Sequence, residues 1–208
     1  MSRMTNLIAA LTCAAVLVLS TCAAKTKLGD SWTDPDYSNG PIKKILVVGV
    51  TAKEQRRQVF EDQFTRMFHT AGIAAEPSHE LIPNVEKLTR EIVESAIGGK
   101  GFDTVIVTRI IDADANYNRS PGGLNAYPVT GFYNSLYGYY GQAWTIVRAP
   151  DYVEYKEIYS LETNIYALST EKLIWTVQSQ AVKKLSAHEA IKTFTTKIIQ
   201  RLKKDGIY

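Results

Sequence analysis

The order of apolar segments constrains the fold of this chain most strongly. Two β-branched runs, at 43–50 (KKILVVGV) and 103–111 (DTVIVTRII), are typical of buried parallel strands. A short strand is expected at 73–76, with amphipathic helices between these strands. The order β-α-β-α-β favours parallel pairing through right-handed crossovers. We therefore expect an α/β fold.

Both expected helices have start and stop signals. Thr51 and Glu54 have the Thr-x-x-Glu spacing of a capping box, and Gly72 ends the first helix. The second helix is expected to begin at 83–84 and to close at 98–99. Helical spacing predicts which side chains are buried: Phe60, Phe64, Met67, Phe68 and Ala71 in the first helix, and Val85, Leu88, Ile92 and Ala96 in the second.

The second half of the chain has a different character. Residues 112–142 are rich in Gly, Tyr, Asn and Pro, and antiparallel strands are expected at 143–149, 152–167 and 172–183. A further capping box, Ser186 with Glu189, begins a C-terminal helix. The sequence thus predicts one α/β domain over residues 43–208, with a mixed sheet in which antiparallel strands and a C-terminal helix follow β-α-β-α-β.

The first 22 residues have the features of a membrane address. Arg3 precedes an apolar stretch at 7–19, an order typical of a secretory signal peptide and shorter than the roughly 20 residues of a membrane-spanning helix. Leu19-Ser20-Thr21-Cys22 resembles the lipobox of bacterial lipoproteins, although Thr21 stands where Gly, Ala or Ser is usual. The resemblance implies removal of residues 1–21 and acylation of Cys22 with chains such as palmitate.

The residues after Cys22 predict where the domain is held. Residues 22–42 are polar and contain Gly29, Pro35 and Gly40, as expected of a tether. Ala23, rather than Asp, follows the cysteine, which resembles the sorting signal for the outer membrane in two-membrane bacteria. We expect a lipid-anchored protein on the periplasmic face of the outer membrane.

Composition and motifs argue against several kinds of chemistry. Loss of Arg3 lowers the formal net charge from +3 to +2, which is not the balance of a nucleic-acid binder. Both cysteines, Cys13 and Cys22, precede the folded domain, so no disulfide or cysteine metal site is expected. The chain has no His-Glu-x-x-His, P-loop or Gly-x-Ser-x-Gly motif. We expect no cofactor, no metal and no enzymatic activity.

The Gly/Tyr-rich segment is the candidate surface for binding a partner. Tyrosine offers a large contact area with a polar tip, and glycine offers an adaptable backbone. The alternative is a structural loop whose tyrosines pack on the sheet. Arg56 and Arg57 are interpreted as the solvated start of a helix, with anion recognition as the alternative. The candidate partner-binding residues are Tyr127, Phe132, Tyr133, Tyr137, Tyr139, Tyr140 and Trp144.

Several segments together resemble an uncharacterised family of bacterial envelope lipoproteins, known only as a domain of unknown function. They are Ser31-Trp32-Thr33-Asp34-Pro35-Asp36-Tyr37, 45–50, Arg56-Arg57 with Phe60-Glu61-Asp62, Leu161-Glu162-Thr163-Asn164 and Lys172-Leu173-Ile174-Trp175. More distantly, the order of elements is similar to the amino-terminal domain of the Tol-system periplasmic protein, the curli secretion lipoprotein and lipoprotein activators of cell-wall synthases.

These resemblances imply binding or ring assembly rather than a reaction. The expected function is that of a binding or accessory protein in the cell envelope, with an envelope protein or a second copy of the chain as partner. The alternatives are an enzyme acting on envelope polymers and a homo-oligomeric structural lipoprotein.

Overall fold

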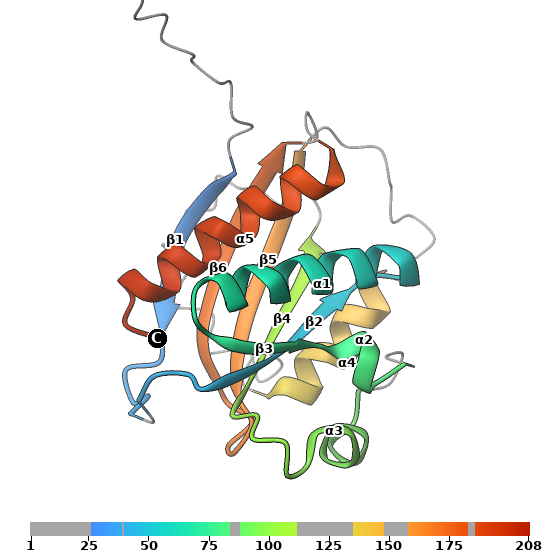
Figure 1. The fold of residues 1–208 in the computed structure, drawn as a ribbon, viewed down its shortest axis with the longest axis vertical. Coiled ribbons are helices and arrows are strands. Elements are labelled where there is room, and N and C mark those ends of the chain that lie inside the picture. Colours follow the sequence, from blue (N-terminus) through green and yellow to red (C-terminus); the bar gives the residue numbers. More distant parts are fainter. Residues whose placement is uncertain (1–25, 39, 84–87, 112–134, 148–157, 183–185) are drawn as a thin grey trace, which may run out of the picture.

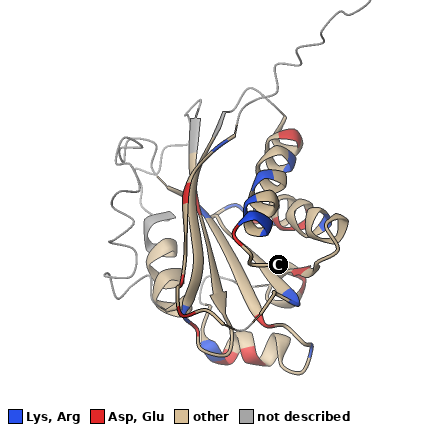
Figure 2. Cartoon of the chain, turned by 90° about the vertical axis from the view of Figure 1, so that its left-hand side faces the viewer, with Lys and Arg blue, Asp and Glu red and all other residues tan. Residues whose placement is uncertain are grey.

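The computed structural model describes residues 26–38, 40–83, 88–111, 135–147, 158–182 and 186–208. Over these residues, the fold is a mixed six-stranded sheet with helices on both faces (Figures 1 and 2), which confirms the predicted α/β class and C-terminal helix. The elements are β1 (Lys27–Thr33), β2 (Lys44–Val50), α1 (Glu54–Thr70), β3 (Ala74–Pro77), α2 (Ser78–Leu81), α3 (Arg90–Ile97), β4 (Thr104–Ile111), α4 (Leu136–Val147), β5 (Ile158–Ala167), β6 (Leu173–Val182) and α5 (Ala187–Lys204).

The sheet order is β1-β6-β5-β4-β2-β3. The predicted parallel part is present, because β2 pairs in parallel with both β3 and β4. The remaining pairs, β4 with β5, β5 with β6 and β6 with β1, are antiparallel. One row of paired positions crosses the sheet from β2 to β6, and all its side chains are fully buried: Val47, Ile106, Ile165 and Trp175.

Helices α1 and α5 cover one face of the sheet (Figure 2). Phe64 and Phe68 of α1 stack with their ring centroids 4.8 Å apart, and Phe194 of α5 meets Phe64 at 6.0 Å. These rings occur at the helical spacing that the sequence predicted, and burying such side chains stabilises the fold by about 1.5–3 kcal/mol each. The phenylalanine cluster therefore fixes α1 and α5 against each other and against the sheet.

Helices α3 and α4 supply the apolar cluster on the opposite face. Tyr139 and Tyr140 of α4 are buried there beside Tyr166 of β5, and the rings of Tyr139 and Tyr166 lie 5.8 Å apart. Burial on both faces explains why β2 and β4 are nearly continuous apolar runs rather than alternating ones.

Part of the predicted tether belongs to the sheet. Within 22–42, β1 forms an edge strand paired with β6, with a register shift between Leu28 and Ser31. Two hydrogen bonds hold this edge, because the Asp205 carboxylate accepts from the Ser31 hydroxyl at 2.5 Å and from the Trp175 indole at 2.8 Å. The irregular pairing at Gly29 and Asp30 leaves no alternating pattern, which is why composition suggested a linker.

The strand predicted at 143–149 is wrong. Residues Leu136–Val147 form α4 instead, so the helix also includes the end of the segment assigned to a Gly/Tyr-rich loop. Its fully buried members Leu136, Tyr139, Tyr140 and Ala143 have the i, i+3, i+4, i+7 spacing of a helix face. Packing against the sheet outweighs the poor helix propensity of Gly138 and Gly141.

Two helix starts differ from those predicted, and one agrees. No side chain caps α1, whose N-cap is Lys53, so the capping box at Thr51 is wrong. Thr89 caps α3, although the helix was expected to begin at 83–84, and Ile92 is 37% exposed rather than buried. The box at α5 is confirmed, since Ser186 accepts a hydrogen bond from the backbone N–H of Glu189.

Among the described residues, no helix is long and apolar enough to span a bilayer.

Candidate functional site

The tyrosines chosen from the sequence do not form an exposed surface in the described part of the chain. Tyr139, Tyr140 and Trp144 are only 0%, 1% and 7% exposed, because α4 turns them into the core. The interpretation of these three as partner-binding residues is therefore corrected to that of core residues. The remaining candidates Tyr127, Phe132 and Tyr133, together with Cys22, lie outside the described residues.

Tyr137 is the candidate that remains partly exposed. Burial of part of the side chain, followed by the charge of Glu171, raises its pKa to about 12. The pKa of this phenol is higher in the folded state than in the unfolded state. The folded protein therefore loses stability as the pH rises above 10.0, the ordinary pKa of tyrosine. Ionisation of Tyr137 is thus expected to destabilise the fold in strong alkali.

This shift can be tested by titrating the absorbance of tyrosinate in the wild type and in Tyr137→Phe. The variant is expected to lack one phenol that ionises near pH 12, and to match the wild type below pH 10. In denaturant, both proteins should titrate at the ordinary tyrosine pKa of about 10. Identical curves for the two folded proteins above pH 11 would contradict the assignment.

Two buried polar networks lie where the parallel strands end. Open α/β sheets bind ligands at the carboxyl ends of their strands. These two networks are therefore the first candidates for a catalytic or ligand-binding site. One follows β2 and β3 and centres on Arg57 and Glu61 of α1. The other lies at the end of β4 and centres on Arg109 and its neighbour in β5, Glu162.

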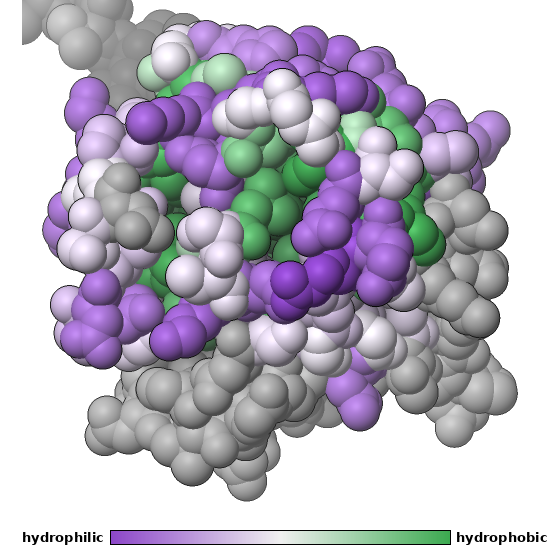
Figure 3. Space-filling view, turned by 90° about the horizontal axis from the view of Figure 1, so that it is seen from below, coloured by the Kyte–Doolittle hydropathy of each residue, from purple (hydrophilic) through white to green (hydrophobic). Residues whose placement is uncertain are grey.

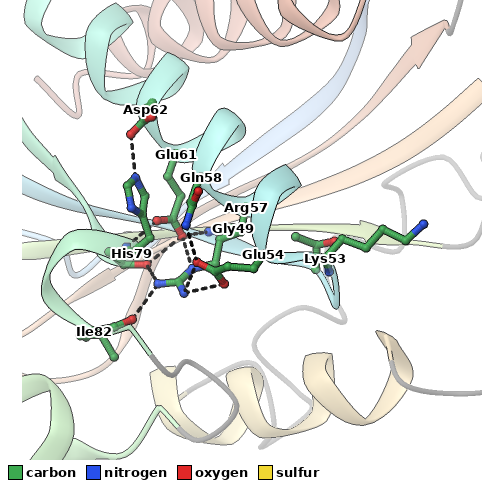
Figure 4. A network of polar contacts seen from close by, with 11 residues as sticks. Gly49, Lys53, Glu54, Arg57, Gln58, Glu61, Asp62, His79 and Ile82 are labelled. Carbon is green, nitrogen blue, oxygen red and sulfur yellow. Dashed lines mark hydrogen bonds and ion pairs between the residues drawn. The ribbon is translucent and has the colours of Figure 1, made fainter.

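Arg57 is fully buried and connects three segments of the chain (Figure 4). Its Nε donates to Glu61 Oε1 at 3.0 Å, one turn along α1. One terminal nitrogen donates to the Ser78 hydroxyl at 3.1 Å and to the carbonyl of Ile82 at 2.9 Å, and the other reaches Glu54 at 3.2 Å. The guanidinium therefore pins α2 and the chain after it to α1.

Glu61 is the acceptor that completes this network. Its carboxylate accepts from the backbone N–H groups of Gly49 at 2.8 Å and His79 at 2.7 Å, and from the Ser78 hydroxyl at 2.7 Å. Burial raises the pKa of Glu61, while the Arg57 charge and these hydrogen bonds lower it and offset part of the shift. The arrangement is that of an internal ion pair with its partners satisfied.

Gly49 allows this close approach of β2 to α1. A Cβ at Gly49 would lie 3.0 Å from Cδ1 of Phe60 and 3.6 Å from Cγ of Glu61. Gly49→Ala is expected to lower the free energy of unfolding by about 1–3 kcal/mol, because the Phe60 ring must shift to make room for the new Cβ. The matched control is Gly141→Ala in α4, where nothing lies within 4 Å of the new Cβ.

Urea denaturation of both variants checks this prediction. Gly141→Ala is expected to raise stability by up to about 1 kcal/mol, because alanine favours a helix. A Gly49→Ala protein as stable as the wild type would show that the contact between β2 and α1 is not tight.

His79 contacts a second carboxylate beside this network. Its Nε2 lies 2.7 Å from Asp62 Oδ1, and ligand atoms of Asp62, His79 and Glu80 lie within 4.8 Å of one another. Three such groups are the ligand types of a divalent cation. The closest pair, however, has hydrogen-bond separation, and two ligands of one tetrahedral zinc lie roughly 3.3 Å apart. The hydrogen bond by itself explains why they are close.

The second network is a buried triad. Arg109 Nε donates to Glu162 Oε2 at 2.8 Å and to the Tyr139 hydroxyl at 2.9 Å, and that hydroxyl donates to the same carboxylate at 2.8 Å. Arg109 is 7% exposed, and the other two are fully buried. Burial, and then the charge of Glu162, raise the pKa of Tyr139 well above its ordinary value. The triad joins α4 to β4 and β5.

The contacts of Ser78, His79 and Asp62 can be compared with those of a hydrolytic triad. Ser78, His79 and Asp62 are the residue types of a hydrolytic triad, but the Ser78 hydroxyl is bonded to Arg57 and Glu61. The His79 ring is bonded to Asp62 instead. A triad requires the nucleophile and its base to be hydrogen-bonded to each other. Both networks therefore act as internal connections between elements.

Sequence reasoning missed these residues, although signals for them are present. Arg57 and Glu61 have i, i+4 spacing, which allows an ion pair on one helix face. Arg109 is a charge inside an otherwise apolar buried strand, where it needs a partner. Arg56 is exposed as expected, whereas Arg57 is not at a solvated helix start.

One end of the domain does present apolar side chains. Figure 3 shows the end at which α3 and the β5–β6 turn lie in Figure 1. Apolar side chains form the floor of a hollow there, and hydrophilic side chains surround it. At this end of the domain, Arg90 of α3 pairs with Glu171 of the β5–β6 turn at 2.5 Å. An apolar centre with a polar rim is the usual anatomy of a binding surface.

Comparison with known proteins gives a distant likeness of structure. No protein-family model matches the chain, and no curated protein is similar to it in sequence. The PelC dodecamer from Paraburkholderia phytofirmans aligns with a TM-score of 0.44 at 8% identity, covering 86% of this chain and 97% of PelC. A variant of that PelC in another space group gives 0.43 at 9% identity, covering 86% and 98%. At this TM-score, the likeness supports no inference about ligands, assembly or activity.

Proposed function

We propose that this chain is a lipoprotein anchored through Cys22 at the periplasmic face of the outer membrane, and that its domain works by binding a partner in the cell envelope. The sequence Leu19-Ser20-Thr21-Cys22 supports the anchor. The observation that carries the binding role is the apolar hollow with its hydrophilic rim (Figure 3). In this proposal the partner is a second envelope protein whose apolar side chains fill the hollow.

The arrangement of the domain supports the same proposal. β1 begins at Lys27, at the end of the molecule opposite to α3 and the β5–β6 turn (Figure 1). A chain anchored at Cys22 would therefore be held at one end and would present the hollow at the other. In this arrangement the hollow lies away from the point at which the chain is attached and faces a partner in the periplasm.

In-cell photo-crosslinking tests this proposal. A photo-reactive residue is placed at Lys100, before β4, or at Lys172, in the β5–β6 turn; both side chains are exposed at the end with the hollow. Gln55, which is exposed on α1, serves as the matched control position. We expect one dominant envelope protein to be captured from the first two positions and not from Gln55.

The anchor is tested in the same cells with Cys22→Ala. This variant is expected to lose its acyl chains, to leave the membrane fraction and to lose the crosslink. Self-crosslinks alone from Lys100 and Lys172 would contradict a heterologous partner and would indicate an oligomeric scaffold. No crosslink from a correctly localised protein would contradict the hollow as the binding surface.

A further inference from the structure

We propose that the outer, basic face of α5 lies against the anionic lipid headgroups of the membrane in which Cys22 is anchored. This inference rests on the proposed lipid anchor and adds to it an orientation and a second contact. It is argued from the short connection between Cys22 and the domain, and from the charges that α5 presents.

The length of chain between the anchor and the domain limits the distance of the domain from the membrane. The main-chain carbonyl of Thr26 accepts a hydrogen bond from Nζ of Lys197 at 2.5 Å, so the chain joins the domain beside the middle of α5. Only three residues lie between Cys22 and Thr26, so four residue steps join the two. Even fully extended, they span about 14 Å. An acylated Cys22 therefore holds α5 close to the lipid surface.

The outward-facing charges of α5 are almost all positive. Phe194, Ile198 and Leu202 are buried in the core, so the polar positions face outward. In Figure 2, several stretches of the ribbon of this helix have the colour of Lys and Arg. Within Ala187–Lys204, Glu189 is the single acidic residue. The helix has five Lys and Arg residues, which are Lys192, Lys197, Arg201, Lys203 and Lys204.

These basic groups lie within reach of the same lipid surface. Lys192, Lys203 and Lys204 are exposed. At 1.5 Å per residue, they lie within about 11 Å of Lys197 along the helix axis. Lys27, the first residue of β1, is also exposed next to the anchoring chain. Lysines that lie this close to a lipid surface are attracted to anionic headgroups, and salt screens that attraction.

Lysine labelling on vesicles tests the orientation. The acylated protein is added to preformed vesicles of phosphatidylcholine, with or without phosphatidylglycerol, and exposed lysines are acetylated and quantified by mass spectrometry. We expect Lys192, Lys203 and Lys204 to react about threefold more slowly on the anionic vesicles than on the neutral ones, and about 1 M salt to abolish the difference. Lys100 and Lys172, at the far end, should react equally on both.

A pair of double variants gives a matched control. Lys203→Gln/Lys204→Gln is expected to reduce the protection of Lys192, and Lys100→Gln/Lys172→Gln is expected to leave it unchanged. Protein that floats with both kinds of vesicle but shows equal reactivity at α5 overturns the orientation and leaves the anchor standing. Protein that does not float with either vesicle overturns the proposed anchor, and the orientation with it.

Discussion

Arg57→Met is expected to lower the free energy of unfolding by about 3–5 kcal/mol, because it leaves the Glu61 carboxylate buried without its counter-charge. Both side chains are 0% exposed, so water cannot replace the lost contact. The variant also removes the donors that hold Ser78 and the carbonyl of Ile82, and α2 loses its connection to α1. Urea denaturation at neutral pH measures the loss.

This loss should depend on pH, and its sign follows from Glu61. Burial already raises the pKa of Glu61, and Arg57 is the largest influence that lowers it again. Removing Arg57 therefore raises the pKa of Glu61 further. A folded state that binds a proton more tightly than the unfolded state loses stability as the pH rises. The difference between variant and wild type is expected to be smallest below pH 4.5, where Glu61 is protonated in both states, and to grow toward neutral pH.

Arg66→Met is the matched control for this prediction. Arg66 lies on the same helix, is exposed, and donates one hydrogen bond, to Gln63 at 2.8 Å. Its replacement should change the stability by less than about 1 kcal/mol at every pH. Equal effects of the two variants, or a loss at Arg57 that does not vary with pH, would show that the Glu61 carboxylate is not the group left uncompensated.

The parallel half of the fold could be predicted because its signals are local. The runs at β2 and β4 are long, β-branched and apolar, and the phenylalanine stripe of α1 repeats at helical spacing. β5 and β6 followed from alternation and from the turn between them. These patterns need no knowledge of the partner element, because each one identifies its own buried face.

α4 could not be predicted because its local and tertiary signals conflict. Gly138 and Gly141 weaken a helix, and Thr145, Ile146 and Val147 are β-branched, so propensity favoured a loop followed by a strand. The helix exists because Leu136 and Ala143 fit against the sheet with the tyrosines between them. That contact depends on strands that lie far away in the sequence.

The buried polar networks could be predicted only in part. An i, i+4 pair such as Arg57 and Glu61 is visible in the sequence, but an exposed pair has the same spacing. What distinguishes them is the chain after β3, which passes over the pair and brings Ser78 and Ile82 to it. The sequence places Glu162 within an expected strand at 152–167, but only the register of β4 with β5 shows that it meets Arg109.

The Arg109–Glu162 pair gives the second large expected effect. Arg109→Met and Glu162→Leu should each cost about 3–5 kcal/mol of unfolding free energy, because each takes away the opposite charge that lies 2.8 Å from a buried charge. The double variant removes both charges and fills the space with apolar atoms. It is therefore expected to cost less than the sum of the two single variants, by up to about 3 kcal/mol.

Urea denaturation of the wild type, both single variants and the double variant completes this cycle. Tyr139→Phe is a milder variant for comparison with the two charge removals. It keeps the buried ring and removes only the hydroxyl that bonds to Arg109 and Glu162. It should cost about 1–3 kcal/mol, the penalty for leaving hydrogen-bonding groups unpaired. Strictly additive losses from Arg109→Met and Glu162→Leu would mean that the two charges do not stabilise each other. A cooperative cycle would establish that the buried ion pair joins β4 to β5. A loss of stability in Tyr139→Phe would establish that Tyr139 ties α4 to this pair and serves the fold.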